Sequence, residues 1–289
     1  MFPALCVEFW KLRREVLAAL RETDQPFPSV TLADSLHPDK VPSAALRGTQ
    51  DAVLAHVDQD GFAFAVDPVD APLFNLRDRR LQRNRHQVDI VIYEGRVCIR
   101  KRFLARPSDR SFGRKLLLSL LFHREAAALL RLRDLPVVPQ IRGIDLPSKT
   151  IYRDYIQGDS LRHRVGARGE IIHDLDLGNS EQTRHLNEAE LEEREIKLFF
   201  PMRDKELTAR ICDNLRQINR RGVALVDDIN LGNVVVGHQS GCPYWIDLEF
   251  THLSGFPEWE KSLRDQNLRI KKWFGISMEK PSGRESDMQ

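Results

Sequence analysis

The stretch LVDDINLGNVVVGHQSGCPYWIDLEF, at residues 225–250, constrains the fold more than any other part of this chain. It places Asp228, Asn233 and Asp247 at the ends of two short apolar runs, which are joined by a glycine-containing turn. Two such runs with a turn between them predict a hairpin, and its pairing brings Asp247 back beside Asn233. Because acidic and amide side chains at strand ends rarely stabilise a core, this arrangement indicates chemistry.

A carboxylate and an amide that lie close together can coordinate Mg²⁺ through oxygen atoms. A second carboxylate nearby can accept a proton from an attacking hydroxyl group. These are the requirements of phosphoryl transfer, in which the protein mainly positions groups and neutralises charge. The alternative interpretation is turn capping, because Asp and Asn favour the ends of loops and NLGN is a good turn.

Length and composition set the limits of this interpretation. A chain of 289 residues, 42% hydrophobic and 30% charged, predicts a soluble globular protein of one bilobed unit or two domains. The 44 basic and 42 acidic residues nearly balance, so nucleic acid is not expected as a partner. Four widely spaced cysteines predict reduced thiols in the cytoplasm. No stretch reaches the roughly 18 uncharged apolar residues that a membrane span needs.

Hydrophobic periodicity and turn signals predict the main elements. We expect helices at 9–20, 44–57, 116–136 and 204–221, and strands at 150–156, 234–236 and 244–248. The runs VDIVIY and RVCIRKRF, separated by Glu94 and Gly95, predict a hairpin. The helix at 116–136 is apolar nearly all round, so it should be buried on more than one side.

DDINLGN followed by IDLEF resembles the catalytic loop D-x-x-x-x-N and the metal-binding D-F-G segment of the protein-kinase-like superfamily. The resemblance, which covers about residues 88–250, implies that Asp228 is the catalytic base and that Asn233 and Asp247 are metal ligands. IDLE is closer to the I-D-F-E of antibiotic and choline kinases than to D-F-G. The resemblance also implies ATP and Mg²⁺ as cofactors.

Upstream features of the superfamily follow in the expected order. RVCIRKRF resembles the V-A-I-K strand and offers Lys101, or Arg100 in its place, to the nucleotide phosphates. Glu125 resembles the helix glutamate that pairs with this lysine, and a buried Glu on an apolar helix is costly without a cationic partner. Two alternatives remain open: Glu125 pairs with its helix neighbours Arg124 and Arg131, and Lys101 belongs to a solvated strand edge.

IYRDYIQGDSL resembles the hinge that joins the two lobes of such enzymes. By this resemblance the backbone around Arg153, Asp154 and Tyr155 would meet the adenine edge. No G-x-G-x-x-G loop precedes VCIRK, so the basic run at 77–86 is a candidate cover for the phosphates.

The expected fold class is α+β, a bilobed protein-kinase-like fold with a minimal C-lobe. We expect an N-terminal extension at 1–75, an N-lobe at 76–150, and a hinge (151–158) with a helical C-lobe at 151–289. Only 42 residues follow Asp247, fewer than the peptide-docking subdomain of protein kinases needs. The chain in this respect resembles the lipopolysaccharide core sugar kinases of Gram-negative bacteria and the small RIO-type kinases.

The expected acceptor is therefore a hydroxyl group on a glycan or lipid-linked sugar of the bacterial surface, phosphorylated in the cytoplasm. Contact with the inner face of the membrane stays open. Two alternatives also stay open. One is an atypical serine/threonine protein kinase, against which Asn230 argues because it replaces a lysine usual in that class. The other is a pseudokinase, which the missing glycine-rich loop and Val226, in place of a histidine, permit.

Overall fold

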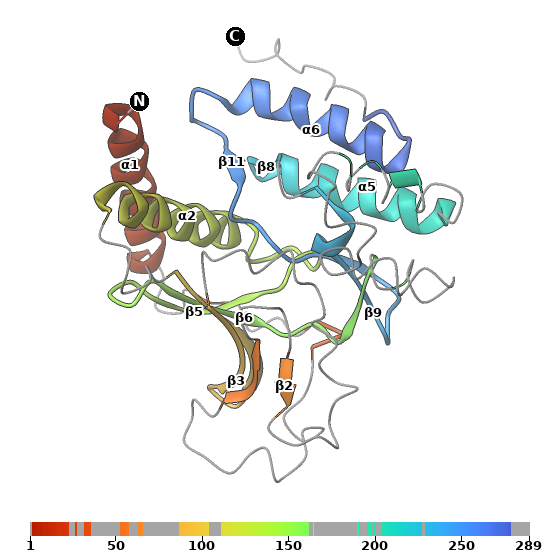
Figure 1. The fold of residues 1–289 in the computed structure, drawn as a ribbon, viewed down its shortest axis with the longest axis horizontal. Helices are drawn as coiled ribbons and strands as arrows, with labels where there is room; N and C mark the ends of the chain where they lie inside the picture. Colours follow the sequence, from red (N-terminus) through yellow and green to blue (C-terminus); the bar gives the residue numbers. More distant parts are fainter. Residues whose placement is uncertain are drawn as a thin grey trace.

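The computed structural model describes residues 2–22, 27, 32–35, 53–57, 63–65, 87–103, 111–161, 164, 190, 193, 196, 197, 199, 204–226 and 229–278 (Figure 1). All statements below concern these residues. They form a mixed α+β structure, as the sequence predicts. Asp228 and the basic run at 77–86 lie outside the described residues.

A six-stranded antiparallel sheet forms one part of the molecule, with the strand order β2-β1-β3-β4-β6-β5. The bounds are Val53–Val57 (β1), Ala63–Ala65 (β2), Gln87–Tyr93 (β3), Arg96–Arg102 (β4), Ile141–Asp145 (β5) and Thr150–Asp154 (β6). Glu94 and Gly95 join β3 to β4 with φ angles of 48° and 72°. Two residues with positive φ suit the twist of a tight hairpin, so the predicted hairpin is confirmed.

Helix α2 (Phe112–Arg131) connects β4 to β5 and lies against the sheet, while α1 (Phe2–Arg21) packs on α2 (Figure 1). Every residue of α2 from 118 to 130 except Arg124 is buried, which confirms the prediction of a helix covered on several sides. The helix starts four residues earlier than predicted and ends at Arg131. The following residues form turns ahead of Pro136, since a proline disfavours helix in the residue before it.

Two smaller sheets and two further helices complete the described fold. Strands β7 (Gly158–Ser160), β9 (Val234–Gly237) and β10 (Pro243–Trp245) form one sheet in the order β10-β9-β7, and β8 (Val223–Leu225) pairs with β11 (Thr251–Leu253). The helices are α5 (Lys205–Arg220) and α6 (Trp259–Phe274), and a short 3-10 helix, η6, spans Leu231–Asn233. Figure 1 shows α5 and α6 on the opposite side of α2 from the six-stranded sheet.

Helix α5 follows its sequence signals closely. Asp204 is its N-cap and accepts hydrogen bonds from the amides of Glu206 and Leu207 at 2.9 and 3.1 Å. Its buried side chains include Ile211, Leu215 and Ile218, which belong to the same hydrophobic core as α1, α2 and α6. The predicted amphipathic helix is confirmed.

Three expectations about elements are wrong. Residues 53–57, placed in a helix, form strand β1, because the apolar run VLAHV pairs with β3 instead. The strand expected at 244–248 ends at Trp245, where the chain leaves the hairpin and turns towards α2. The segment after Phe250 was expected to be helical, as part of the C-lobe, whereas it holds strand β11 as well as the 16-residue α6.

Among the residues that the structure describes, no helix has the length and apolar character required to cross a membrane.

Candidate functional site

Lys101 on β4 is the centre of a buried charge cluster. Its Nζ lies 2.7 Å from Glu125 Oε2, 2.8 Å from Asp247 Oδ1 and 3.3 Å from Glu249 Oε2. Side chains alternate across a strand, so Lys101 faces α2 while its neighbour Arg100 faces away. Lys101 is only 2% exposed, and Glu125 is fully buried. The ion pair expected between these two residues is therefore present.

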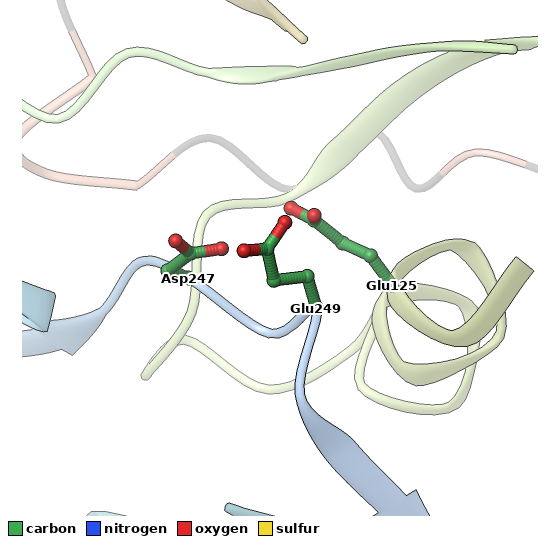
Figure 2. Close-up of side chains that lie close together, drawn as sticks. All are labelled: Glu125, Asp247 and Glu249. Carbon is green, nitrogen blue, oxygen red and sulfur yellow. The ribbon is translucent and has the colours of Figure 1, made fainter. Parts of the chain in front are cut away.

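The three carboxylates come from two elements that are distant in sequence. Glu125 points from α2 towards Asp247 and Glu249, which rise from the segment between β10 and β11 (Figure 2). One oxygen of each lies within 4.8 Å of the others. The ammonium group of Lys101 lies among these oxygens and balances part of their charge.

Burial and the neighbouring carboxylates shift the pKa of Lys101 in opposite directions. Burial alone would lower the pKa of Lys101, but the carboxylates of Asp247, Glu125 and Glu249 outweigh it and hold that pKa above its usual value. Burial raises the pKa of Glu249 to about 8; Lys101 acts against this rise, and the charges of Asp247 and Glu125 add to it. Lys101 is therefore charged at neutral pH, while Glu249 holds a proton for part of the time.

Asn233 reaches the site through the β9–β10 hairpin. Trp245 pairs with Val234, and the next amide, that of Ile246, donates a hydrogen bond of 3.0 Å to the Asn233 carbonyl. Asn233 and Asp247 therefore lie at the same end of the hairpin, as predicted, and the Asn233 side chain is buried.

The turn that precedes this hairpin has its own cap. The side chain of Asn230 accepts hydrogen bonds from the amides of Gly232 and Asn233 at 2.9 and 3.2 Å. The capping residue of this turn is therefore Asn230, whereas the alternative interpretation concerned Asp228, Asn233 and Asp247. The cap fixes the backbone that carries Asn233.

The stretch expected to act as a hinge is tied into the protein at several points. Arg153 Nη1 lies 3.3 Å from Glu125 Oε1, and Asp154 binds Arg142 through both oxygens, each at 2.6 Å. The amide of Asp154 donates to the Gln140 carbonyl, and that of Tyr155 donates to the carbonyl of Val97. The amides of Asp154 and Tyr155, which the resemblance assigned to the adenine edge, are therefore already bonded within the protein.

Part of the N-terminal extension covers one edge of this stretch. Ser35 forms an antiparallel bridge with Ile156, and the amide of Gln157 donates a hydrogen bond of 2.8 Å to the Asp34 carbonyl. In this bridge the hydrogen bond joins the neighbours of the bridged pair, Gln157 and Asp34. The N–H and C=O groups of Ile156 therefore point away from Ser35. The extension thus supports the chain from one side.

Asp34 also fastens the β9–β10 hairpin. Its buried carboxylate accepts hydrogen bonds from the amides of Gln239 and Ser240 and from the hydroxyl of Tyr244, the last at 2.9 Å. Burial would raise the pKa of Asp34, but these hydrogen bonds and that of the Ser240 hydroxyl hold it below its usual value. Residues that the sequence left without a role thus hold the element that carries Asn233.

Sequence reasoning also missed Glu249 and the ionic role of Arg153. Glu249 stands two residues after Asp247, and in an extended segment such residues share a face. The two-residue spacing could therefore have predicted that Glu249 lies on the same side of the chain as Asp247. Arg153 gave no such signal, because its partner Glu125 lies on a different element.

No protein-family model matches this chain, and no curated protein matches it in sequence. The side chains of the Lys101 cluster are therefore the basis for assigning a function.

Proposed function

We propose that this chain is an ATP- and Mg²⁺-dependent phosphotransferase with a bilobed protein-kinase-like fold and a minimal C-lobe. One observation carries the proposal: the buried Nζ of Lys101 on β4 is bound by Glu125 from α2 and by Asp247 from the segment after β10. The sequence motifs predicted the pairing of Lys101 with Glu125, and they assigned Asp247 to metal binding. A strand lysine, a helix glutamate and a loop aspartate are the residues that protein kinases use around the nucleotide phosphates.

The architecture supports the same proposal. In the order β3-β4-β6-β5, the helix with Glu125 lies between β4 and β5 in sequence, which brings it behind the strand with Lys101. Strands β1 and β2 pair into the sheet beside β3, so we place the N-lobe at 53–150, starting before the residue 76 expected from the sequence, and the hinge and C-lobe at 151–289. Strand β6 ends at Asp154, inside the proposed hinge.

Each residue has a role in this proposal. Lys101 contacts the phosphates, and Glu125 keeps the lysine in position. Asn233 and Asp247 hold Mg²⁺ through their side-chain oxygens, and Glu249 lies beside Asp247. When bound, the ion neutralises the charge of the phosphates. Asp228, outside the described residues, accepts the proton of the attacking hydroxyl.

We further propose that the acceptor hydroxyl belongs to a sugar on a bacterial glycan or lipid. Three residues separate Asp247 from β11, and β11 pairs directly with β8. This short connection leaves no room between them for the long segment that positions peptide substrates in protein kinases. A small acceptor is the simpler fit to such a site.

The test starts with thermal unfolding in the presence of ATP and Mg²⁺ and continues with labelled γ-phosphate. We expect stabilisation by the nucleotide, transfer to a glycan acceptor, and loss of transfer in Asp228→Asn. Stabilisation without any transfer would identify a pseudokinase, and label in protein would refute the sugar acceptor. If the nucleotide neither stabilises the chain nor is consumed, the phosphotransferase proposal is wrong.

A further inference from the structure

Helix α1 has two faces of different chemistry. Leu12 and Val16 on its inner face are buried in the core. Glu8 and Glu15, the two acidic residues of the helix, both turn towards α2 and form ion pairs with arginines there. The inner face therefore uses all the negative charge that α1 carries.

The outer face lines an open groove of about 610 Å³. The described residues along it all belong to α1, and they are of only two kinds, apolar and basic. They are Val7, Trp10, Leu17 and Ala18, with Lys11, Arg13, Arg14 and Arg21. Their spacing of three and four residues places them on one side of the helix.

The apolar side chains on this face are unusually open to solvent. Val7 is 69% exposed and Trp10 is 60% exposed, and Arg13 stacks on the Trp10 ring with its guanidinium carbon 5.2 Å from the ring centre. Lys11 is tied to the body of the protein, because its Nζ donates to the Gly255 carbonyl. The three arginines thus supply the outward positive charge around an exposed tryptophan.

We propose that the outer face of α1 binds an anionic lipid surface. Val7 and Trp10 enter the interfacial region, and Arg13, Arg14 and Arg21 contact the phosphates of the headgroups. A helix with an apolar and aromatic strip, flanking cations and no acid on the same face is suited to this position. Negatively charged lipids attract such cations, and tryptophan favours the boundary between headgroups and acyl chains.

The positive charge of the outer face of α1 favours an anionic lipid surface over a second copy of the chain as its partner. A symmetric contact through this face would set the cations of one copy against those of the other, because no described residue along the groove carries a carboxylate to receive them. The nearest acid in sequence, Glu22, follows the last residue of the helix. This proposal does not depend on the phosphotransferase activity, since it uses none of the residues of the Lys101 cluster.

The experiment is co-sedimentation of the full chain with vesicles of phosphatidylcholine alone and of phosphatidylcholine mixed with phosphatidylglycerol. We expect binding to the mixed vesicles, weakened by salt, with a blue shift of tryptophan emission that Trp10→Phe removes. Arg13→Glu with Arg14→Glu should weaken binding by about ten-fold or more. Trp10→Ala, which alters no charge, should weaken it too.

The matched control is Lys261→Glu with Arg264→Glu, which changes the net charge equally at exposed positions of α6. This control should retain binding within about two-fold, because its residues lie on another helix. The proposal is wrong if the control loses as much vesicle binding as Arg13→Glu with Arg14→Glu. It is also wrong if the wild type binds vesicles of phosphatidylcholine alone as strongly as the mixed vesicles. Self-association of the wild type that Arg13→Glu with Arg14→Glu abolishes, without vesicle binding, would overturn it too. Circular dichroism verifies that each variant is folded.

Discussion

Arg153 and Glu125 form an ion pair with 3.3 Å between Nη1 and Oε1, on the oxygen of Glu125 that Lys101 does not bind. One buried carboxylate therefore serves two cations, one from β4 and one from β6. The two strands are neighbours in the sheet, so Glu125 fixes α2 against both. Loss of Glu125 should therefore lower the stability more than loss of Arg153, its partner on β6.

Glu125→Gln and Arg153→Met test this arrangement. Glu125→Gln leaves Lys101 and Arg153 buried near each other without that carboxylate, so we expect a loss of about 3–5 kcal/mol in the free energy of unfolding. Arg153→Met leaves the Lys101 pair intact and should cost less, about 1–3 kcal/mol. Urea denaturation measures both values. If Arg153→Met proves the more damaging of the two, Glu125 is not the central residue of the cluster.

Lys101→Met should destabilise the protein in a pH-dependent way. Without the ammonium group, three carboxylates whose oxygens lie within 4.8 Å repel one another, and only protonation relieves the repulsion. We expect a loss of about 3–5 kcal/mol near pH 7.5 and a smaller loss near pH 5. Arg100→Met, on the other face of β4, is the matched control. The same loss at both pH values would contradict this account. Phosphate transfer should disappear in Lys101→Met only.

Glu249→Gln should remove part of the pH dependence of stability. The pKa of Glu249 is raised from 4.5 to about 8, so between these values the folded state retains a proton that the unfolded state releases. The free energy of unfolding therefore decreases as pH rises through this window. Relative to wild type, Glu249→Gln should gain about 1–3 kcal/mol on going from pH 5 to pH 8.

Chemical denaturation of both proteins at several pH values measures this difference. Glu260→Gln, at an exposed position of α6, serves as the control and should leave the slope unchanged. A difference between Glu249→Gln and wild type that stays constant from pH 5 to pH 8 would show that Glu249 does not titrate in this range.

Asp34→Asn should loosen the β9–β10 hairpin. The substitution replaces a carboxylate that accepts from two amides and the Tyr244 hydroxyl, and hydrogen bonds to charged acceptors are the stronger ones. We expect a loss of about 1–3 kcal/mol at pH 7. Because the pKa of Asp34 is lowered, this contribution is present at neutral pH and disappears as pH falls through the folded-state pKa.

The matched control for Asp34→Asn is Asp145→Asn. Asp145 also caps a turn, where it accepts from the Ser148 hydroxyl, but it is exposed. Its substitution should change stability by less than about 0.5 kcal/mol. Thermal unfolding compares the two, and hydrogen exchange of the Gln239 and Ser240 amides should increase in Asp34→Asn alone. Unchanged exchange there would exclude a fastening role for Asp34.

Local signals in the sequence predicted the elements that carry the cluster. The hairpin turn at Glu94 and Gly95 and the apolar surface of α2 each depend on residues near in sequence. The pairing of Lys101 with Glu125 was expected from the resemblance and from the cost of a buried charge. Such features need no knowledge of distant contacts.

Other features depend on contacts between distant segments, which local patterns do not encode. Asp34 binds the turn at Gln239 and Ser240 from more than 200 residues away. The strand at 53–57 was mistaken for helix because its neighbour β3 supplies the pairing that decides its conformation. The bounds of helix α6 were not predicted, because the burial of its Ile270, Trp273 and Phe274 depends on packing against β8 and β11.

Glu8 and Glu15 of α1 bind Arg124 and Arg131 of α2, and Arg124 is adjacent to Glu125 in the chain. Arg131 in turn donates to the carbonyl of Gly222 at 3.0 Å, so the same connection continues to the start of β8. A displacement of α1 must therefore carry α2 along or break both ion pairs. A movement of the N-terminal helix is therefore transmitted through Arg124 and Arg131 to the part of α2 that carries Glu125.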